Sequence, residues 1–158
     1  MKEELPYEIR FVSGDEWEEA MELAWKTFLE FAGDVYPPEG IRSFEDFITD
    51  STLKRMFIMG AYQVMAAYDH EKMVGMISLR NETHISLLFV DRYYHRKGIG
   101  KALISGLSKY VKEEIGKSQI TVNASPYGVD FYHRLGFRDV GPQKQQDGII
   151  FTPMLLTI

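Results

Sequence analysis

HISLLFVDRYYHRKGIGKALISGL, residues 84–107, joins a strand-like run to a helix-like run through a basic turn with two glycines. Apolar residues dominate 84–91, and beyond the turn they recur with the 3.6-residue period of a helix. Gly98 and Gly100 carry no side chains, so successive backbone N–H groups can point at one anion beside the positive end of the helix dipole. The stretch therefore predicts a strand, an anion-binding turn and a helix, in that order.

Two other glycine-rich phosphate loops do not fit this turn. A nucleoside-triphosphate P-loop needs a first glycine where this chain has His95, and a Ser or Thr where it has Ala102. A dinucleotide-binding loop needs a third glycine where this chain has Leu103. The turn therefore argues against a nucleoside triphosphatase and against an NAD-dependent enzyme, although a pyrophosphate fits it.

The composition indicates one globular unit. At 158 residues the chain is long enough to bury a sizeable core and short for two domains, so we expect a single domain over 1–158. The absence of cysteine excludes disulfides, zinc-thiolate sites and a cysteine acyl-enzyme. The formal net charge of -5 argues against a general nucleic-acid-binding protein. The four histidines show no metal-ligand spacing, so no metal is expected.

No segment of the sequence has the length and hydrophobicity of a membrane span. The longest apolar run, 57–68, is interrupted by Gln63 and is shorter than the roughly 18 apolar residues that a span needs. The acidic N-terminal segment lacks the apolar centre of a signal peptide. We therefore expect a cytoplasmic protein without a membrane partner.

The order of the predicted elements indicates a mixed sheet with helices. After a short strand at 7–12, a helix is predicted up to Gly33, then irregular structure at Pro37 and Pro38, and a second helix from Ser43. The remaining elements are a three-strand meander, a long helix, a strand, a short helix and two closing strands, at 61–69, 73–81, 84–91, 99–116, 119–124, 128–135, 136–141 and 148–158. This order predicts an α+β or mixed α/β fold.

A second motif, NASPYGVDFYHRLGF at 123–137, follows the glycine turn along the chain. Together the two motifs resemble the signatures of the GCN5-related N-acetyltransferases (GNAT), although His95 stands where the family turn usually carries Gln or Arg. The resemblance implies a mixed, mostly antiparallel central sheet of about seven strands flanked by about four helices. It also implies an acetyl-CoA-dependent N-acetyltransferase in which a primary amine attacks the thioester directly.

The resemblance further implies which residues bind acetyl-CoA, the co-substrate. In the family the strand corresponding to 84–91 carries a bulge and splays from its neighbour, which frees backbone groups for the pantetheine arm. By carry-over, Leu88 and Val90 are the backbone contacts, with the Leu88 N–H as donor to the thioester carbonyl oxygen, and Phe89 between them is also expected at the cofactor. Asn123 and Tyr132 are expected near the pantetheine end. The turn expected at the pyrophosphate consists of His95, Arg96, Lys97, Gly98, Ile99, Gly100 and Lys101.

Three residues are candidates for moving protons. The two-residue period of a strand places His84 on the same face as Leu88 and Val90, so His84 is the first candidate for the general base. Glu82 is the second candidate, and a water chain is a further alternative. Tyr132 matches the family tyrosine that protonates the leaving thiolate, although an aromatic residue on a short helix also suits a core.

The sequence does not specify the acceptor. The segment 31–41 corresponds to a region that shapes the acceptor side in the family, and its Asp34, Tyr36 and Glu39 suit a cationic amine on a small molecule or a peptide. A polyamine, an aminoglycoside, an amino acid and a protein amine all remain open. Two other functions also remain open, a non-enzymatic acyl-CoA-binding or regulatory domain and a module for another diphosphate. The closing strand at 148–158 leaves a homodimer and a monomer equally open.

Overall fold

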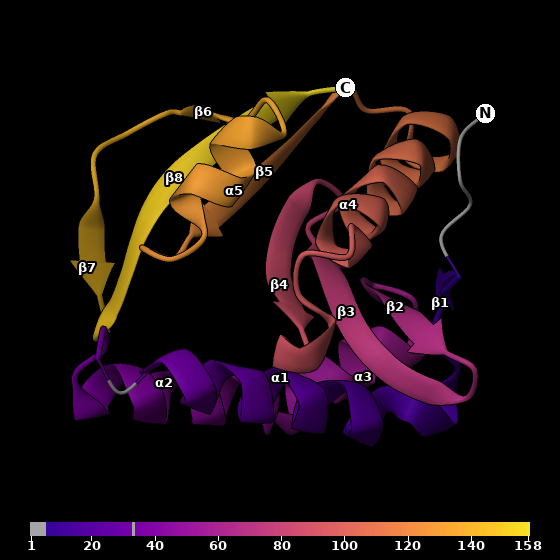
Figure 1. The fold of residues 1–158 in the computed structure, drawn as a ribbon, viewed down its shortest axis with the longest axis horizontal. Helices are drawn as coiled ribbons and strands as arrows, with labels where there is room; N and C mark the ends of the chain where they lie inside the picture. Colours follow the sequence, from indigo (N-terminus) through magenta and orange to yellow (C-terminus); the bar gives the residue numbers. More distant parts are fainter. Residues whose placement is uncertain (1–5, 33) are drawn as a thin grey trace.

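The computed structural model describes residues 6–32 and 34–158, and within them eight β-strands form one open sheet (Figure 1). The order across the sheet is β1-β2-β3-β4-β5-β8-β6, and β7 pairs with the start of β8. Only β4 and β5 pair in parallel, which confirms the predicted mixed, mostly antiparallel sheet. The strands are β1 Glu8–Phe11, β2 Tyr62–Asp69, β3 Lys72–Arg80, β4 His84–Val90, β5 Gln119–Ala124, β6 Arg138–Asp139, β7 Lys144–Gln146 and β8 Ile149–Thr157.

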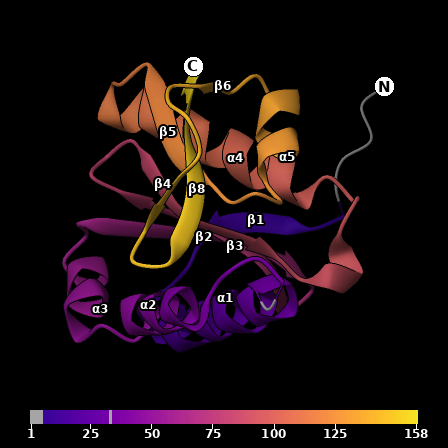
Figure 2. The ribbon, with the colours of Figure 1, turned by 90° about the vertical axis from the view of Figure 1, so that its left-hand side faces the viewer.

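Helices cover both faces of the sheet (Figure 2). On one face lie α1, α2 and α3, and on the other lie α4 and α5, and each layer buries its own apolar cluster against the strands. None of the described helices is long and apolar enough to cross a membrane. Their bounds are α1 Trp17–Ala32, α2 Pro38–Ile48, α3 Ser51–Ile58, α4 Ile99–Tyr110 and α5 Val129–Arg134, with 3-10 turns at Gly14–Glu16 and Arg92–Tyr94 and a π-helical turn at Val111–Ile115.

The segment after α1 differs from the predicted local structure. α2 begins at Pro38, because proline at the first helical position loses no hydrogen bond and its fixed φ suits a helix. Ser43 therefore lies inside α2, and its hydroxyl donates to the Asp147 carbonyl at 2.7 Å. The predicted second helix divides in two, because the Asp50 carboxylate caps α3 by accepting a backbone N–H at 2.8 Å. Gly33, predicted to close α1, lies outside the described residues.

β4 carries one extra residue relative to β3. Between Ile85 and Leu87 the pairing slips by one position, which leaves Ser86 without a partner on β3. Past this bulge, Leu88 packs in the apolar cluster under α4, whereas Phe89 packs in the cluster toward α1 and α2. The bulge therefore resets which side chains of β4 face each helical layer.

The bulge contradicts the predicted face of His84. Ile85 packs in the cluster under α4, so its neighbour His84 points to the opposite face, toward α1 and α2. Leu88 and Val90 lie on the α4 face, because the extra residue reverses the alternation between them and His84. The strict two-residue period was wrong here, since a bulge leaves no mark in a run of apolar residues.

β4 and β5 separate soon after they meet. Their parallel pairing covers only His84↔Thr121 and Ile85↔Val122. Beyond these pairs β4 continues beside β3, while β5 continues beside β8, and Figure 1 shows the two halves of the sheet diverging. The edge of β4 that faces β5 is therefore unpaired from Ser86 onward.

A contact between α2 and the β7–β8 turn joins the two halves at the far end of this opening (Figure 1). Gly40 and Gly148 meet backbone to backbone, so that a Cβ added to Gly148 would overlap the Gly40 nitrogen. Gly148 also has φ +79°, a left-handed conformation that favours glycine. Together with the hydrogen bond from Ser43 to Asp147, this contact fixes the hairpin to the helical layer.

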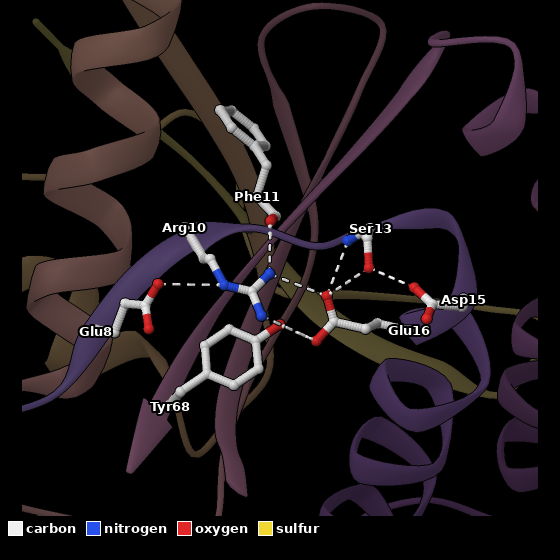
Figure 3. Close-up of polar contacts among 7 residues, drawn as sticks. All are labelled: Glu8, Arg10, Phe11, Ser13, Asp15, Glu16 and Tyr68. Atoms are coloured by element: carbon white, nitrogen blue, oxygen red, sulfur yellow. Dashed lines mark hydrogen bonds and ion pairs between the residues drawn. The ribbon is translucent and has the colours of Figure 1, made fainter. Parts of the chain in front are cut away.

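A charged network ties β1 to the start of α1 (Figure 3). Arg10 donates to both carboxylate oxygens of Glu16, at 2.9 and 3.2 Å, and the Tyr68 hydroxyl donates to the same carboxylate at 2.7 Å. The Ser13 N–H adds a further hydrogen bond at 2.9 Å. Hydrogen bonding by Arg10 and these donors lowers the pKa of Glu16 to about 2, although burial acts in the opposite direction.

Glu16→Gln is expected to lower the free energy of unfolding at pH 7 by about 1–2 kcal/mol, because it removes a charged acceptor shared by several donors. Because its pKa is lowered in the folded state, ionised Glu16 contributes its full stabilisation at pH values above its ordinary pKa of 4.5. This contribution is lost as the pH falls toward 2. Urea unfolding at a series of pH values should show that the difference in free energy of unfolding between wild type and Glu16→Gln becomes smaller as the pH falls. Glu8→Gln is the control, since Glu8 meets Arg10 at 3.3 Å from a mostly exposed position. Equal losses in both variants would contradict this description.

Gly148→Ala is expected to destabilise the protein more than Gly60→Ala. Both glycines have left-handed φ, so alanine at either position loses about 1–2 kcal/mol from backbone strain. Gly60 has nothing within 4 Å of an added Cβ, whereas Gly148 would strike the Gly40 backbone, which adds about 1–3 kcal/mol of overpacking. Chemical denaturation measures both losses, and equal values would mean that the contact with α2 contributes nothing.

Candidate functional site

A cleft of about 900 Å³ lies where β4 and β5 separate. Its lining comes from both helical layers as well as from the edge of β4, the turn before α4, and β8. The sequence-predicted cofactor residues gather here, with Lys97 alone outside the lining; those in the lining are Leu88, Phe89, Val90, His95, Arg96, Gly98, Ile99, Gly100, Lys101, Asn123 and Tyr132.

The open edge of β4 presents two backbone N–H groups to this cleft. The Asp91 N–H donates to the Val74 carbonyl of β3 at 2.8 Å. Because alternate residues of an antiparallel pair bond to the neighbouring strand, the N–H groups of Leu88 and Val90 face the other way, toward β5. β5 has already separated at this point, so both N–H groups are open to a ligand. By the same alternation the backbone of Phe89 faces β3, away from the predicted cofactor edge.

The Val90 carbonyl at this edge already has a partner. The His95 imidazole donates to it through Nε2 at 2.7 Å and stacks on the Phe31 ring, with centroids 6.0 Å apart. Phe31 in turn lies 5.8 Å from the ring of Tyr127, which precedes α5. The side chain of His95 therefore connects the turn to β4 and α1.

The turn before α4 has the backbone shape that its glycines suggested. Gly98 has φ +81° at the start of α4, and Arg96 is also left-handed, with φ +61°. The Ala102 N–H reaches back to the Gly98 carbonyl at 3.0 Å, so the N–H groups just before Ala102 belong to the open first turn of the helix. Gly100 faces α5, where an added Cβ would lie 3.0 Å from the Phe131 ring. The glycines therefore permit both the open N–H groups and the close packing of α5.

Asp91 fixes the start of this turn. Its buried carboxylate accepts the Tyr93 N–H at 3.0 Å and pairs with Lys26 of α1 at 3.2 Å. Burial acts to raise its pKa, but these two donors outweigh burial and lower the pKa of Asp91 overall. The carboxylate therefore stays charged and holds β4, the turn and α1 together.

Positive charge gathers around the turn. Arg96, Lys101 and Arg134 line the cleft from the turn, α4 and α5. Asp147, at the opposite end, is the one carboxylate that the described residues contribute to the lining. This distribution suits an anionic ligand at the turn. Within 6–32 and 34–158, no three histidine, aspartate or glutamate side chains come close enough to hold a metal ion.

His84 lies where β4 and β5 part. Its Nδ1 meets the Thr121 hydroxyl at 2.8 Å, and the ring lines the cleft. Burial, and secondly the nearby Arg80 guanidinium, lower the pKa of His84 below its ordinary value. The imidazole is therefore neutral at pH 7 and can accept a proton. Glu82, the second candidate for the base, lies in the turn between β3 and β4 and outside the lining of this cleft.

Tyr132 and Asn123 line the cleft from α5 and β5. The Tyr132 ring is buried between Phe131 and Phe137, each edge-on to it, with centroids 5.2 and 5.1 Å away. This burial raises the pKa of Tyr132, so its hydroxyl keeps its proton and can act as a donor. Asn123 lies opposite Pro153 of β8 in the register of the sheet.

The side of the cleft toward α1 and α2 differs from the sequence-based expectation. Of the three residues proposed to receive a cationic amine, only Tyr36 lines the cleft. Its phenol contacts the Ser125 hydroxyl, while burial raises the pKa of Tyr36. Asp34 and Glu39 are exposed and lie outside the lining. The fold therefore places outside the cleft both of the carboxylates that suggested a basic acceptor.

Four rings on this side form a surface that the sequence did not indicate. Phe28, Tyr36, Phe44 and Phe89 come from α1, the following loop, α2 and β4, and we refer to them as the aromatic wall. In the sequence Phe28 belongs to the apolar stripe of a helix, a pattern that also suits a core residue. The density of phenylalanines along 28–47 was the available signal, but their convergence on one cleft depends on the tertiary fold.

The sequence matches a family model and a curated protein over most of its length. The family model described as "Acetyltransferase (GNAT) domain" matches residues 33–158. The uncharacterized N-acetyltransferase YafP of Escherichia coli (strain K12) is 34% identical to this chain over 113 residues, which cover 72% of this chain and 69% of that protein. The residues that the family model matches include both signature motifs, the glycine turn and 123–137.

Solved structures share the fold at low sequence identity. A GCN5-related N-acetyltransferase from Rhodopseudomonas palustris gives a TM-score of 0.83 at 20% identity, over 100% of this chain and 99% of that one. The PaiA N-acetyltransferase from Thermoplasma acidophilum, solved in complex with coenzyme A, gives a TM-score of 0.79 at 21% identity, over 96% of this chain and 99% of that one. A dodecameric spermidine N-acetyltransferase from Vibrio cholerae gives a TM-score of 0.67 at 12% identity, over 96% of this chain and 94% of that one. At these identities the likeness supports the fold alone.

We expect His84 to titrate below the ordinary histidine pKa of 6.5, because burial and the Arg80 charge both disfavour the imidazolium. The chemical shifts of its ring protons, followed by NMR against pH, measure this value. Arg80→Gln should raise the pKa part of the way, since it removes the charge and leaves the burial. A wild-type value at or above 6.5 would contradict this description of the site.

Proposed function

Because this chain belongs to the GNAT acetyltransferase family, we propose that it is an N-acetyltransferase that moves the acetyl group of acetyl-CoA to a primary amine by direct attack. Family membership confirms the resemblance that the two sequence motifs suggested. The observation that carries the proposal is the unpaired edge of β4, whose Leu88 and Val90 N–H groups open into a cleft that also contains the glycine turn.

The residues around the cleft fit the parts of acetyl-CoA. The open N–H groups at the start of α4, with Arg96 and Lys101 beside them, suit the pyrophosphate. The unpaired N–H groups of Leu88 and Val90 suit the carbonyl oxygens of the pantetheine arm and the thioester, and Asn123 is a further hydrogen-bonding partner. Acetyl-CoA therefore finds both the charge and the backbone donors that its binding needs.

Few groups are needed for the chemistry. Acetyl-CoA supplies an acetyl thioester, and during the reaction the bond from its carbonyl carbon to sulfur breaks while a bond from that carbon to the amine nitrogen forms. The Leu88 N–H donates to the carbonyl oxygen, where negative charge develops. His84 accepts the proton that the amine loses, and Tyr132 gives a proton to the departing sulfur. Solvent then carries the proton from His84 back to Tyr132, which restores the enzyme.

The environments of the two proton-transfer groups support these roles. The lowered pKa of His84 keeps the imidazole neutral and ready to accept a proton. The Tyr132 hydroxyl is protonated at neutral pH, as a donor to the departing sulfur must be, although burial raises its pKa and makes it a weaker acid than a free phenol. His84 is favoured over Glu82 as the base because only His84 lines the cleft. The absence of cysteine is consistent with direct attack, since no cysteine acyl-enzyme is possible.

A non-enzymatic acyl-CoA-binding domain is the alternative to this proposal. The cleft favours the enzyme because it continues past the cofactor edge to His84 and to a second, aromatic region suited to an acceptor. The single domain over 1–158, the cytoplasmic location and a homodimer stay predictions.

Tyr132→Phe and His84→Ala are each expected to lower kcat by about 100-fold or more, the usual contribution of a general acid or base. The KM for acetyl-CoA should change little in both variants, since neither side chain is required for the backbone contacts. For wild type, kcat/KM should fall on the acid side as His84 becomes protonated, below about pH 6.5. Thiol release from acetyl-CoA, measured with an accepted amine, gives these rates.

Glu82→Gln is the control for these two variants, because Glu82 lies outside the cleft, and its rate should stay near wild type. Near-wild-type rates in both Tyr132→Phe and His84→Ala would show that the assigned roles are wrong. Acetyl-CoA binding without transfer to any amine would favour the non-enzymatic alternative.

A further inference from the structure

We infer that the acceptor is an aromatic monoamine whose ring packs on the aromatic wall while its nitrogen reaches His84. This inference rests on the proposed acetyl transfer and adds the chemical class of the second substrate. It depends on three observations: the geometry of the four rings, the charges that line the same region, and the face of β4 on which His84 lies.

The rings of the aromatic wall pack on one another and together line one side of the cleft. Phe28 and Phe44 are almost parallel, at 12°, with centroids 3.9 Å apart, and Tyr36 lies 5.4 Å from Phe28 at 23°. Phe89 meets Phe44 edge-on at 5.6 Å. Trp25 stacks on both Phe28 and Phe44 at 6.3 Å from outside the lining and supports them. An aromatic ligand in the cleft therefore meets an aromatic surface whose side chains are already held in place by one another.

The region is also apolar on the β8 side. Ile149, Ile150 and Phe151 line the cleft at the start of β8, and Phe47 lines it from α2. The contact between Gly40 and Gly148 holds this strand against α2, so both sides of the region are fixed in place. This region therefore favours an acceptor with a flat apolar group over an acceptor with a flexible polar chain.

The charges of the cleft argue against a polycation. Asp147 is the single carboxylate that the described residues place in the lining, whereas Arg80 adds positive charge close to His84. A polyamine would bring several ammonium groups into the cleft with at most one carboxylate to pair with, and unpaired charges in such a site are strongly unfavourable. A molecule with one amine avoids this difficulty. The spermidine acceptor of the structurally similar Vibrio cholerae enzyme is therefore not expected here.

The bulge in β4 brings the base and the ring surface to the same side of the sheet. His84 faces α1 and α2, and Phe89, farther along the strand, packs in the cluster on that side. Both residues therefore line the cleft from the same face of the strand, His84 at the start of β4 and Phe89 near its end. An amine attached to a ring on the aromatic wall can approach His84 without crossing the sheet.

The test compares benzylamine with cyclohexylmethylamine, which have the same carbon skeleton, and expresses each kcat/KM per concentration of unprotonated amine, because the phenyl ring also makes benzylamine the weaker base. With acetyl-CoA saturating, kcat/KM for benzylamine is expected to exceed that for cyclohexylmethylamine by on the order of tenfold, and that for spermidine by more. Phe44→Leu should bring the ratio of benzylamine to cyclohexylmethylamine close to one. Phe57→Leu is the matched control, since Phe57 packs on Trp17 outside the cleft, and it should preserve the ratio.

The outcomes separate this inference from the proposed function. Acetylation of cyclohexylmethylamine or spermidine at a rate equal to or above that of benzylamine would overturn the aromatic acceptor and leave the N-acetyltransferase standing. Absence of transfer to every amine, with acetyl-CoA bound, would overturn both. The wild-type preference between the two matched amines decides the question even if Phe44→Leu does not fold.

Discussion

The extra residue at Ser86 governs how this molecule builds its site. On the His84 side of the bulge, the side chains of β4 follow one alternation, and beyond it they follow the opposite one. His84 consequently faces α1 and α2, while Leu88 and Val90 send their side chains under α4 and their N–H groups toward the space left by β5. One strand thereby supplies a candidate base to one face of the sheet and hydrogen-bond donors to its edge.

An unpaired strand edge inside a protein has to be held open by the rest of the fold. Neighbouring strands satisfy each other's backbone N–H and C=O groups, so β4 and β5 would be expected to continue pairing if nothing kept them apart. Each half of the sheet has its own anchor to the helical layer: Asp91 joins the turn after β4 to Lys26 of α1, and the β7–β8 turn meets α2 backbone to backbone at Gly40. A ligand that accepts hydrogen bonds from Leu88 and Val90 takes the place that a longer β5 pairing would occupy, which couples binding to the geometry of the sheet.

The sequence predicted those parts of the fold and of the site that depend on local patterns of residues. The glycine turn, the apolar period of α4 and the meander of β2 to β4 each depend on neighbouring residues, and all are present at nearly the predicted positions. The bulge at Ser86 was expected only from the family resemblance, because an apolar strand reads the same with or without it. The prediction of irregular structure at Pro38 was wrong, because proline disrupts the interior of a helix but is well suited to the first helical position, which Pro38 occupies in α2. The aromatic wall and the contact of Gly40 with Gly148 join segments distant in sequence, and no local pattern indicates such pairings.

Hydrogen exchange at the backbone amides of Leu88 and Val90, followed by NMR with and without acetyl-CoA, tests the central claim most directly. The account predicts that saturating acetyl-CoA slows exchange at both amides and shifts the signals of Gly98 and Gly100, while ATP leaves the exchange at Leu88 and Val90 unchanged. Unaltered exchange at these two amides in the presence of bound acetyl-CoA would contradict the account, because the open edge of β4 would then not be where the co-substrate is held.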